Sequence, residues 1–519
     1  MLLVAPSTMA EMDRRTIEDL GVPGLVLMES AAGAVVRALL GRYPDAARRG
    51  VGVVAGPGNN GGDGVAIARR LHGLGIQTRV LLCADPARLR GDAATQLALA
   101  RAQDVEVMVV TDAAQLELNA AGVWVDALLG TGLGRDVDGL FEAAIDALNA
   151  DRAPVVAVDI PSGIDGATGQ VRGRAVQADL SVTFAAPKIG HFTEPGRSHR
   201  GHLVVADIGI PASRFGDLVA SSPRLVSDVA SSLRPRAGHK GTFGHLLVVA
   251  GSTGKAGAAR LTAEAALRAG AGLVTLAVPS DLPSDSLAEL APEVMVERVP
   301  ATDGHFDAQS LAPILGLLES RDALALGPGL GTADATVAFA RALYEAASVP
   351  AVVDADALNA LARGGIPRAA SARILTPHPG EMGRLQSTSA GALNRDRLGS
   401  ARALATSSGA VVVLKGAGTV VAAPDGSSSI NASGNPGMGT AGSGDVLTGV
   451  IGAVLAGGAV PSEAARRGVA WHGRAGDHAA ALTGEASLLA SDITAALGAA
   501  LQSSHEADWS FDPPGWSGP

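Results

Sequence analysis

Apolar residues recur along the chain in two alternating patterns, one with the spacing of helices and one in short continuous runs. In the first half, helical spacing predicts helices over residues 9–20 and 25–40, and a continuous run predicts a buried strand at 51–55. Further strands are expected at residues 78–82, 122–125, 155–158, 181–184 and 202–205. Strands that alternate with helices predict a mostly parallel sheet that is covered on both faces.

The second half repeats this alternation after a segment of weak periodicity, 211–236, which contains paired serines and prolines. Strands are expected there at residues 246–250, 274–278, 323–326, 351–353, 374–375 and 411–414. We therefore predict an α/β protein of two doubly wound domains, 1–220 and 236–502, joined by a linker at 221–235. Residues 503–519 fit neither domain and are expected to be a disordered or loosely docked tail.

Composition limits the class of protein. A chain of 519 residues, 47% of them hydrophobic, is too long for one core and can bury more than one. The net charge of -10, with no basic run, argues against nucleic acid as a partner. Cys83 is the only cysteine, which fits a reducing compartment. No signal peptide is recognisable, and the longest uncharged stretch, 446–462, is short for a membrane span. We expect a cytoplasmic protein without a membrane partner.

A glycine-rich loop at 434–445 leads directly into an apolar helical segment. Glycines such as Gly442 and Gly444 let the backbone approach a ligand closely, and the N-terminus of a helix attracts phosphate. Asp445 begins that helix, where its carboxylate can take a proton from a substrate hydroxyl. The alternative is a tight turn in which Asp445 is only the N-cap, because a single glycine-rich loop is a weak signal.

Polar side chains also follow strands of the first half. The residues concerned, near three strand ends, are Asn59, Asn60, Asp63, Asp126, Asp159 and Ser162. In a doubly wound fold such strand ends open on the same edge of the sheet, so these side chains can converge. Each of them alone can belong to a capped turn, but together they predict a shared site whose oxygens can meet a cation or a ribose.

These strand ends resemble the NAD(P)HX epimerase domain, a Rossmann-like family that interconverts the R and S epimers of hydrated NADH and NADPH. The resemblance rests on residues 58–64, 126–134, 158–165 and 184–188, and it covers roughly residues 9–211. It implies that Asn60, Asp126 and Ser162 bind a potassium ion. It also implies that Asp159 contacts the substrate, where it is suited to acid/base work because epimerising a hemiaminal carbon needs C–O cleavage with proton transfer.

The same resemblance implies a set of residues that hold the phosphates of the dinucleotide. They form two loops and comprise Asn59, Asn60, Gly61, Gly62, Asp63, Gly130, Thr131, Gly132, Leu133, Gly134, Arg135 and Asp136.

Turns after the later strands supply groups that the glycine-rich loop lacks. Glu381 can reach a magnesium ion through water. With Asp445 as the base and the amides of 442–444 on the phosphate, an anionic transition state would be stabilised. His378 is either a ligand contact or a turn histidine packed beside two prolines. A cation and backbone donors for nucleotide phosphates come from Lys415, Gly416, Ala417, Gly418 and Thr419.

This half resembles the ribokinase-like superfamily, and within it the ADP/ATP-dependent NAD(P)H-hydrate dehydratases. The matching motifs are 239–241, 269–273, 376–381, 415–419 and 442–445, and the resemblance covers roughly residues 236–500. Sugar kinases of the superfamily usually carry asparagine where His378 stands, which favours the dehydratase. The resemblance implies substrate contacts at Ala258, Gly329, His378 and Asp445, and nucleotide contacts at Lys415, Gly416, Ala417, Gly418, Thr419 and Gly444.

Together the two halves resemble the bifunctional NAD(P)H-hydrate repair enzymes. The resemblance implies epimerisation of the R and S hydrates, followed by dehydration of the S epimer with ADP, which gives AMP and phosphate. We expect K⁺ in the epimerase, Mg²⁺ in the dehydratase, ADP as co-substrate and a homo-oligomer; ADP rather than ATP comes from the resemblance alone. Two alternatives are a ribokinase-like kinase of a vitamin precursor with a regulatory N-terminal half, and an N-terminal half that is a non-catalytic binding module.

Overall fold

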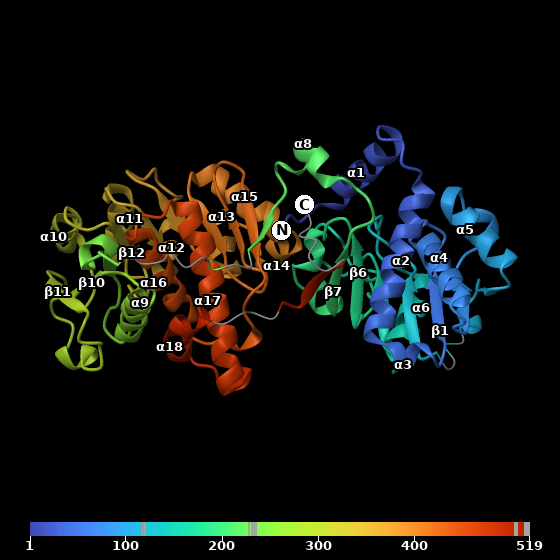
Figure 1. Cartoon of the computed structure of the whole chain (residues 1–519). Helices are drawn as coiled ribbons and strands as arrows, with labels where there is room; N and C mark the ends of the chain where they lie inside the picture. Colours follow the sequence, from blue (N-terminus) through green and yellow to red (C-terminus); the bar gives the residue numbers. More distant parts are fainter. Residues whose placement is uncertain (117, 119–120, 227–228, 230–235, 503–506, 513–519) are drawn as a thin grey trace. The chain divides into compact units, whose positions relative to one another are not determined.

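The structure of the chain is a computed structural model that describes residues 1–116, 118, 121–226, 229, 236–502 and 507–512 (Figure 1). The chain forms two compact units, one of Met1–Arg224 with Glu506–Pro519 and the other of Leu225–His505. Most of the expected linker, residues 227–228 and 230–235, lies outside the described residues, as do 503–506 and 513–519 of the expected tail.

The N-terminal unit is built on an eight-stranded sheet of order β18-β7-β6-β5-β4-β1-β2-β3. All of its strand pairs are parallel. The strands are β1 (Val51–Ala55), β2 (Thr78–Leu82), β3 (Glu106–Val109), β4 (Val123–Ala127), β5 (Val155–Val158), β6 (Leu180–Phe184), β7 (His202–Ala206) and β18 (Trp509–Asp512). The helices are α1 (Pro6–Glu18), α2 (Gly24–Arg42), α3 (Pro44–Ala47), α4 (Asn59–Gly73), α5 (Gly91–Ala102), α6 (Gly139–Ala150), α7 (Gly196–His199) and α8 (Gly216–Val219).

Successive strand residues face opposite sides of this sheet and belong to two separate cores. Val53 of β1 packs in the core that includes α2, α4 and α5. Its neighbour Val54 packs in the core that includes Trp124 and α6. Burial on both faces explains why the strands read as continuous apolar runs. The prediction of a doubly wound α/β fold is confirmed for this unit.

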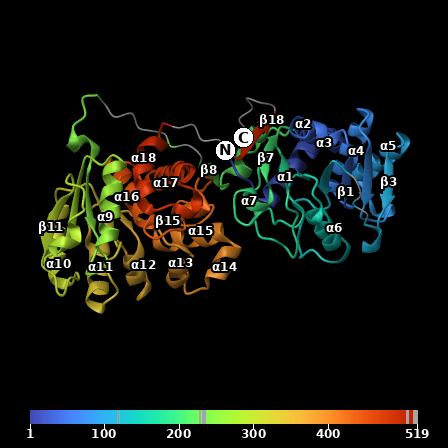
Figure 2. The same ribbon diagram turned by 90° about the horizontal axis from the view of Figure 1, so that it is seen from below.

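The C-terminal strand β18 differs from the expectation of a disordered tail. Trp509–Asp512 pair in parallel with β7, and the red C-terminal strand lies beside β7 in both views (Figures 1 and 2). The pairing gives the backbone of β18 hydrogen-bond partners that a free tail lacks. The N-terminal unit is therefore completed by residues that follow the whole C-terminal unit in the sequence.

The C-terminal unit is built on a ten-stranded sheet of order β11-β10-β9-β12-β13-β14-β15-β16-β17-β8 (Figure 2). The strands are β8 (Arg224–Val226), β9 (His245–Val249), β10 (Leu273–Pro279), β11 (Met295–Val299), β12 (Ala323–Leu326), β13 (Ala351–Val353), β14 (Arg373–Leu375), β15 (Val411–Leu414), β16 (Val420–Ala422) and β17 (Ser428–Asn431). From β11 to β15 the pairs are parallel, and β15, β16 and β17 are antiparallel.

The helices of this unit cover both faces of its sheet, as the separate cores on its two sides show. They are α9 (Ala256–Arg268), α10 (Ala308–Leu318), α11 (Asp334–Ala346), α12 (Ala355–Ala362), α13 (Pro379–Gln386), α14 (Ala390–Arg395), α15 (Arg397–Ser408), α16 (Ser443–Ala456), α17 (Pro461–Thr483) and α18 (Ala490–Ala500).

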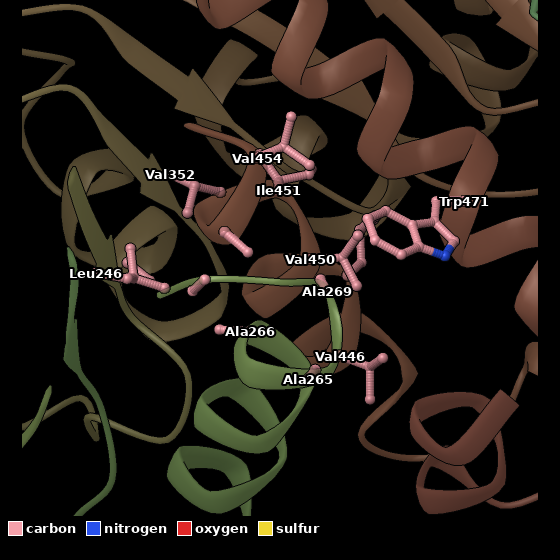
Figure 3. Close-up of a cluster of buried hydrophobic side chains, with 14 of the residues drawn as sticks. Leu246, Ala265, Ala266, Ala269, Val352, Val446, Val450, Ile451, Val454 and Trp471 are labelled. Atoms are coloured by element: carbon pink, nitrogen blue, oxygen red, sulfur yellow. The ribbon is translucent and has the colours of Figure 1, made fainter. Parts of the chain in front are cut away.

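Helix α16, which follows the glycine-rich loop, is buried along nearly its whole length. Val450 and Ile451 pack with Leu246 and Trp471 in the core drawn in Figure 3. A Cβ on Gly449 would lie 2.2 Å from the carbonyl oxygen of Thr262, so this glycine permits the close approach of α16 to α9. The packing of α16 fixes the position of its first turn, in which Asp445 is partly buried.

Helix α2 is long and apolar enough to cross a membrane by length and composition, with a mean hydropathy of 1.5. Half of its apolar stretch is buried inside the unit. The buried side chains, which include Leu27, Val35 and Leu39, pack in the core on one face of the sheet. This is the packing of a core helix in a doubly wound domain.

Candidate active sites

Asp126 and Ser162 meet at the carboxyl edge of the N-terminal sheet. Asp126 is in β4 and fully buried. The Ser162 hydroxyl donates to its Oδ1 at 2.6 Å, and the Ser162 amide donates to its Oδ2 at 2.8 Å. The Ser162 hydroxyl also lies 3.1 Å from the carbonyl oxygen of Leu129. Burial raises the pKa of Asp126 to about 6, although the hydrogen bonds from Ser162 and Leu128 oppose it.

Asn60 lies beside this pair, in the first turn of α4. A Cβ on Gly130 would lie 3.3 Å from the Asn60 side chain, and Gly130 follows Leu129 directly. The Asn60 Nδ2 is buried and has no hydrogen-bond partner among the described residues. The fold therefore brings the three expected potassium ligands to one edge of the sheet. It also leaves Nδ2 of Asn60 there without the hydrogen-bond partner that a buried polar atom normally has.

Asp159, directly after β5, is paired with a buried lysine. The Lys188 ammonium, 1% exposed, donates to its Oδ1, and the Thr183 hydroxyl donates to the same oxygen at 2.9 Å. Burial opposes ionisation of Asp159, but the charge and hydrogen bond of Lys188 outweigh it, so the pKa of Asp159 lies below its usual value. Asp159 is ionised and held in one orientation. Its φ of 65° is a conformation that non-glycine residues adopt at a cost, which is typical of functional sites.

Asp159 interacts with two more carboxylates, those of Asp63 and Asp13. Burial, followed by the charges of Asp159 and Asp13, raises the pKa of Asp63 well above its usual value. Burial also raises the pKa of Asp13, in α1, to about 6, with Lys188 opposing and Asp159 adding to the rise. Asp63 is expected to hold phosphate, and the structure also places it close enough to Asp159 for their charges to interact. Lys188 and Asp13 were not predicted as site residues.

The two loops expected to bind phosphate, 59–63 and 130–136, differ in how closely their glycines are packed. A Cβ on Gly61 would lie 1.9 Å from the Gly56 carbonyl oxygen, and a Cβ on Gly62 would lie 2.9 Å from Ala93. Both glycines therefore permit close packing of α4. No side chain caps this helix at Gly58, so amides of its first turn are available to an anion. In the loop 130–136, Gly130 is partly exposed and lies against Asn60, whereas Gly132 and Gly134 are exposed with open space around them.

Lys415 and Asp354 form the centre of the site in the C-terminal unit. The Lys415 ammonium lies 2.6 Å from Oδ1 of Asp354, and the Thr448 hydroxyl donates to Oδ2 at 2.8 Å. Asp354 follows β13 and is 1% exposed. The charges of Asp354 and Glu381 outweigh the burial of Lys415 and raise its pKa. Asp354 was not predicted as a site residue.

Asp445 and Glu381 both face this pair. Burial raises the pKa of Asp445 to about 7, and the charge of Asp354 adds to the rise while Lys415 opposes it. Burial likewise raises the pKa of Glu381 to about 7, against the attraction of Lys415, whose ammonium is 3.9 Å away. Three carboxylates thus share one lysine, and two of them titrate near neutral pH.

The expected nucleotide turn 415–419 joins β15 to β16, with Gly416 and Gly418 at positive φ. A Cβ on Gly444 would lie 3.2 Å from the Lys415 ammonium, so a side chain there would crowd the cation. The glycine-rich loop and the lysine turn are therefore in contact, as the sequence predicted for a phosphate site.

His378 and Glu381 cap α13 together. The Glu381 carboxylate accepts from the His378 amide at 2.8 Å, and the Gly380 amide donates to Nδ1 of His378 at 3.0 Å. The His378 ring remains half-exposed. Both sequence alternatives for this histidine are thus compatible with its position, because it caps a helix and still presents its ring to a ligand.

Ala258 and Gly329 lie against each other. A Cβ on Gly329 would lie 3.1 Å from the Cβ of Ala258. Lys255, close to both, forms an ion pair of 2.9 Å with Asp356, and the charge of Asp356 also raises the pKa of Asp445. Two of the expected substrate residues, Ala258 and Gly329, are therefore neighbours of Lys255, whose partner Asp356 interacts with Asp445.

Neither unit holds a ready metal cage: in the part of the chain that the structure describes, no three His, Cys, Asp or Glu side chains are arranged to hold an ion. The oxygen atoms present in each unit instead suit ions that the protein holds with only a few of its own ligands. The oxygens of Asn60, Asp126 and Ser162, with the Leu129 carbonyl, suit a monovalent cation of low charge. The crowded carboxylates around Lys415 suit a magnesium ion that keeps most of its ligands as water and phosphate.

The fold and the two sites define an α/β enzyme with one acid/base centre in each unit, the second beside a nucleotide-type turn. Two family models match the chain, one described as YjeF-related protein N-terminus over residues 24–190 and one as NAD(P)H-hydrate dehydratase over residues 246–498.

A bifunctional NAD(P)H-hydrate repair enzyme of Moorella thermoacetica is 42% identical over 505 residues, which cover 95% of each chain. The Escherichia coli enzyme of the same name is 38% identical over 504 residues, 93% of this chain and 91% of that one. A solved structure of the ADP/ATP-dependent NAD(P)H-hydrate dehydratase from Bacillus subtilis is 30% identical and covers 52% of this chain and 92% of its own, with a TM-score of 0.45. The chain belongs to the family of bifunctional NAD(P)H-hydrate repair enzymes, and the resemblance seen in the sequence is confirmed.

Proposed function

We propose that this chain repairs hydrated NADH and NADPH in two steps. The N-terminal unit interconverts the R and S hydrates, and the C-terminal unit dehydrates the S hydrate with ADP, which yields AMP and phosphate. The observation that carries the proposal is the arrangement of Asp445, with a pKa of about 7, at the N-terminus of α16 beside Lys415. A base of that pKa is matched to proton transfer at neutral pH.

In the dehydratase, Asp445 takes the proton of the C6 hydroxyl as its oxygen attacks the β-phosphorus of ADP, and AMP leaves. The Lys415 charge and the amides near Gly444 stabilise the anionic phosphoryl group. Breaking the C6–O bond then releases phosphate, and loss of a proton from C5 forms the C5=C6 double bond. His378, Ala258 and Gly329 line the proposed substrate side, and the turn 415–419 with Gly444 binds the nucleotide.

In the epimerase, the ring nitrogen expels the C6 hydroxyl as water, and water then adds to the other face. Asp159, kept ionised by Lys188, accepts the proton of the incoming water. The departing hydroxyl needs a proton in turn, and Asp63, whose pKa is well above its usual value, is suited to hold it. Residues 59–63 and 130–136 bind the phosphates of the dinucleotide.

Each unit also receives an ion under this proposal. Asn60, Asp126 and Ser162 would hold K⁺, whose charge would stabilise the loops around Asp159. Glu381 would help to hold Mg²⁺, whose charge would offset the negative charge on the transferred phosphoryl group. The proposal assigns epimerisation to residues 1–220 and dehydration to residues 236–502. We also propose a cytoplasmic homo-oligomer.

The experiment supplies an equal mixture of R and S hydrates with ADP, Mg²⁺ and K⁺, and follows the absorbance of reduced nicotinamide. The wild type is expected to consume both epimers. Asp159→Ala is expected to consume the S half quickly and then slow to the uncatalysed rate of epimerisation. A stable phosphorylated product without recovery of reduced nicotinamide would instead support the kinase alternative. A single-phase curve for Asp159→Ala would support an N-terminal binding module.

Replacing K⁺ with Li⁺ sharpens the same test. The exchange is expected to slow the second phase of the wild type, because the smaller ion does not span the three ligands, and to leave the first phase unchanged. An equal slowing of both phases would place the potassium requirement elsewhere.

A further inference from the structure

The strand β18 covers the edge of the N-terminal sheet next to β7. Trp509 is opposite Leu203 and Asp512 is opposite Ala206. The Leu203 amide donates to the carbonyl of Asp508 at 3.0 Å, and the Asp207 amide donates to the carbonyl of Asp512 at 2.9 Å. These bonds give the edge of β7 the same partners that an inner strand has.

Asp508, directly before β18, neutralises a buried arginine. The Arg200 side chain is 0% exposed, and its Nη2 lies 2.9 Å from the Asp508 carboxylate. Its Nη1 donates to the carbonyl of Asp508 at 2.9 Å. Arg197 lies 3.1 Å from the same carboxylate. Asp508 itself is 43% exposed, so only the guanidinium of Arg200 is fully buried. Removing the Asp508 charge is costly because it leaves that buried charge uncompensated.

Arg200 is in turn hydrogen-bonded to the segment that carries the lysine of the active site. Its Nε donates to the carbonyl of His191 at 2.7 Å. The Lys188 amide donates to Nδ1 of His191 at 3.0 Å, and Nε2 of His191 lies 3.0 Å from the carbonyl oxygen of Asp159. Since Nδ1 accepts, Nε2 carries the proton and donates to Asp159. Burial, with Lys188 adding, lowers the pKa of His191 to about 3, so the ring stays neutral.

We propose that the C-terminal strand is a positioning element of the N-terminal active site. Asp508 fixes Arg200, Arg200 fixes His191, and His191 holds the backbone of Asp159 in its positive-φ conformation, with Lys188 on the carboxylate. Asp508, held in place by β18, therefore acts on epimerisation without touching the substrate. This inference rests on the proposed epimerase function of the site.

The strand offers a matched control. Asp512 pairs at 2.7 Å with Arg37 on α2; Arg37 is 58% exposed and Asp512 19%. Because the arginine of this pair lies in water, its charge needs no partner and the pair contributes little to stability. Asp508→Asn and Asp512→Asn make the same chemical change at the two ends of one strand, and only the first breaks the connection to Asp159.

The first experiment measures kcat and KM for both reactions in the full-length protein. Asp508→Asn is expected to lower the kcat of epimerisation by about 10- to 100-fold, with KM nearly unchanged, because small displacements of a reacting group cost rate rather than binding. Asp512→Asn should stay within about twofold, in keeping with the small contribution of an exposed pair. Dehydration, in the other unit, should be unaffected by either change.

The second experiment restores the strand from outside. A chain ending at residue 502 is expected to lose epimerisation, and a peptide of residues 507–512 should restore part of it, because an added strand can pair with an open sheet edge. The same peptide with Asp508→Asn should not.

Four outcomes are decisive. If Asp508→Asn epimerises the hydrates at the wild-type rate, the inference is overturned. It is also overturned if the variant's activity falls only in proportion to the amount of folded protein. If the wild type itself does not epimerise the hydrates, the proposed function fails instead. Rescue by the first peptide and not by the second supports the inference even if the truncated chain is less stable.

Discussion

The two sites use a buried lysine in opposite ways. In the N-terminal unit, Lys188 pairs with Asp159, the proposed catalytic carboxylate, and keeps its pKa below the usual value. In the C-terminal unit, Lys415 pairs with Asp354, and the proposed base Asp445 keeps a pKa of about 7. Lys188 therefore outweighs the burial of Asp159, whereas Lys415, which pairs with another carboxylate, does not outweigh the burial of Asp445.

The difference matches the two proposed reactions. Water that adds to C6 needs a carboxylate that is ionised over a wide range of pH. A base that takes a proton from a hydroxyl and holds it while phosphate is transferred works best with a pKa near the working pH. The comparison teaches that the neighbours of an aspartate, more than its place at a strand or helix end, set its chemistry.

The largest expected effect is that of Asp445→Asn. Dehydration should fall by about 10²–10⁴-fold, because the variant removes the base and preserves its shape. Single-turnover rates with the S hydrate and ADP would measure it. Epimerisation should be unchanged, and Asp334→Asn, at a fully exposed carboxylate of the same unit, should have no effect. Near wild-type dehydration would leave Asp445 only a capping role.

Lys188→Met removes the cation from Asp159. Epimerisation should fall by about 10²-fold, at the low end of the range for a general acid or base. Without the positive charge the pKa of Asp159 should rise by about 1–3 units, so the acidic limb of the pH–rate profile should move to higher pH. Arg48→Met, which removes an exposed pair of the same unit, is the control. If the acidic limb did not move, Lys188 would not be what lowers the pKa of Asp159.

Lys415→Ala tests whether this lysine serves the nucleotide. The KM for ADP should rise by about 10-fold or more, the loss expected for a hydrogen bond to a charged group. The KM for the hydrate should change less. Initial rates with each substrate varied in turn would show it, with Arg363→Ala, an exposed arginine of the same unit, as control. A larger effect on the hydrate would move Lys415 to the substrate side.

The smallest effect is expected for Asp354→Asn. After burial, the charge of Asp354 is the main cause of the raised pKa of Asp445, so its removal should lower that pKa. The acidic limb of the dehydration profile should move to lower pH by about one unit, or ~1.4 kcal/mol. The shift is opposite in sign to that of Lys188→Met. A shift to higher pH would contradict the comparison.

Much of the two sites could be predicted because parallel strands share an edge. That rule predicted that Asn60, Asp126 and Ser162 converge, and the structure brings them together. It also predicted contact between the glycine-rich loop and Lys415. The doubly wound fold followed from the alternation of apolar runs and helical spacing. In these cases the regular geometry of the fold determines which residues, far apart in the sequence, are close in space.

The partners of the charged groups could not be predicted in this way. The motif that contains Lys188 was recognised in the sequence. Its pairing with Asp159 depends on the positive φ of Asp159, which cannot be read from the residue type. Asp354 and Asp356 follow the same strand, and only the packing shows that Asp354 faces Lys415 while Asp356 faces Lys255. The strand β18 is short, and its partner β7 is about three hundred residues earlier, so no local pattern indicates it.

The place of β18 in the sequence has a consequence for synthesis. Leu203 leaves the ribosome long before Trp509, its partner in the sheet. At 5–20 residues per second the interval is roughly 15–60 s. During that time the edge of β7 is open and the guanidinium of Arg200 lacks its counter-charge, and an open edge is a template for pairing with other chains. The newly made N-terminal unit is therefore exposed to mispairing until translation has passed the C-terminal unit, and an interruption of translation within that unit would leave the edge of β7 permanently uncovered.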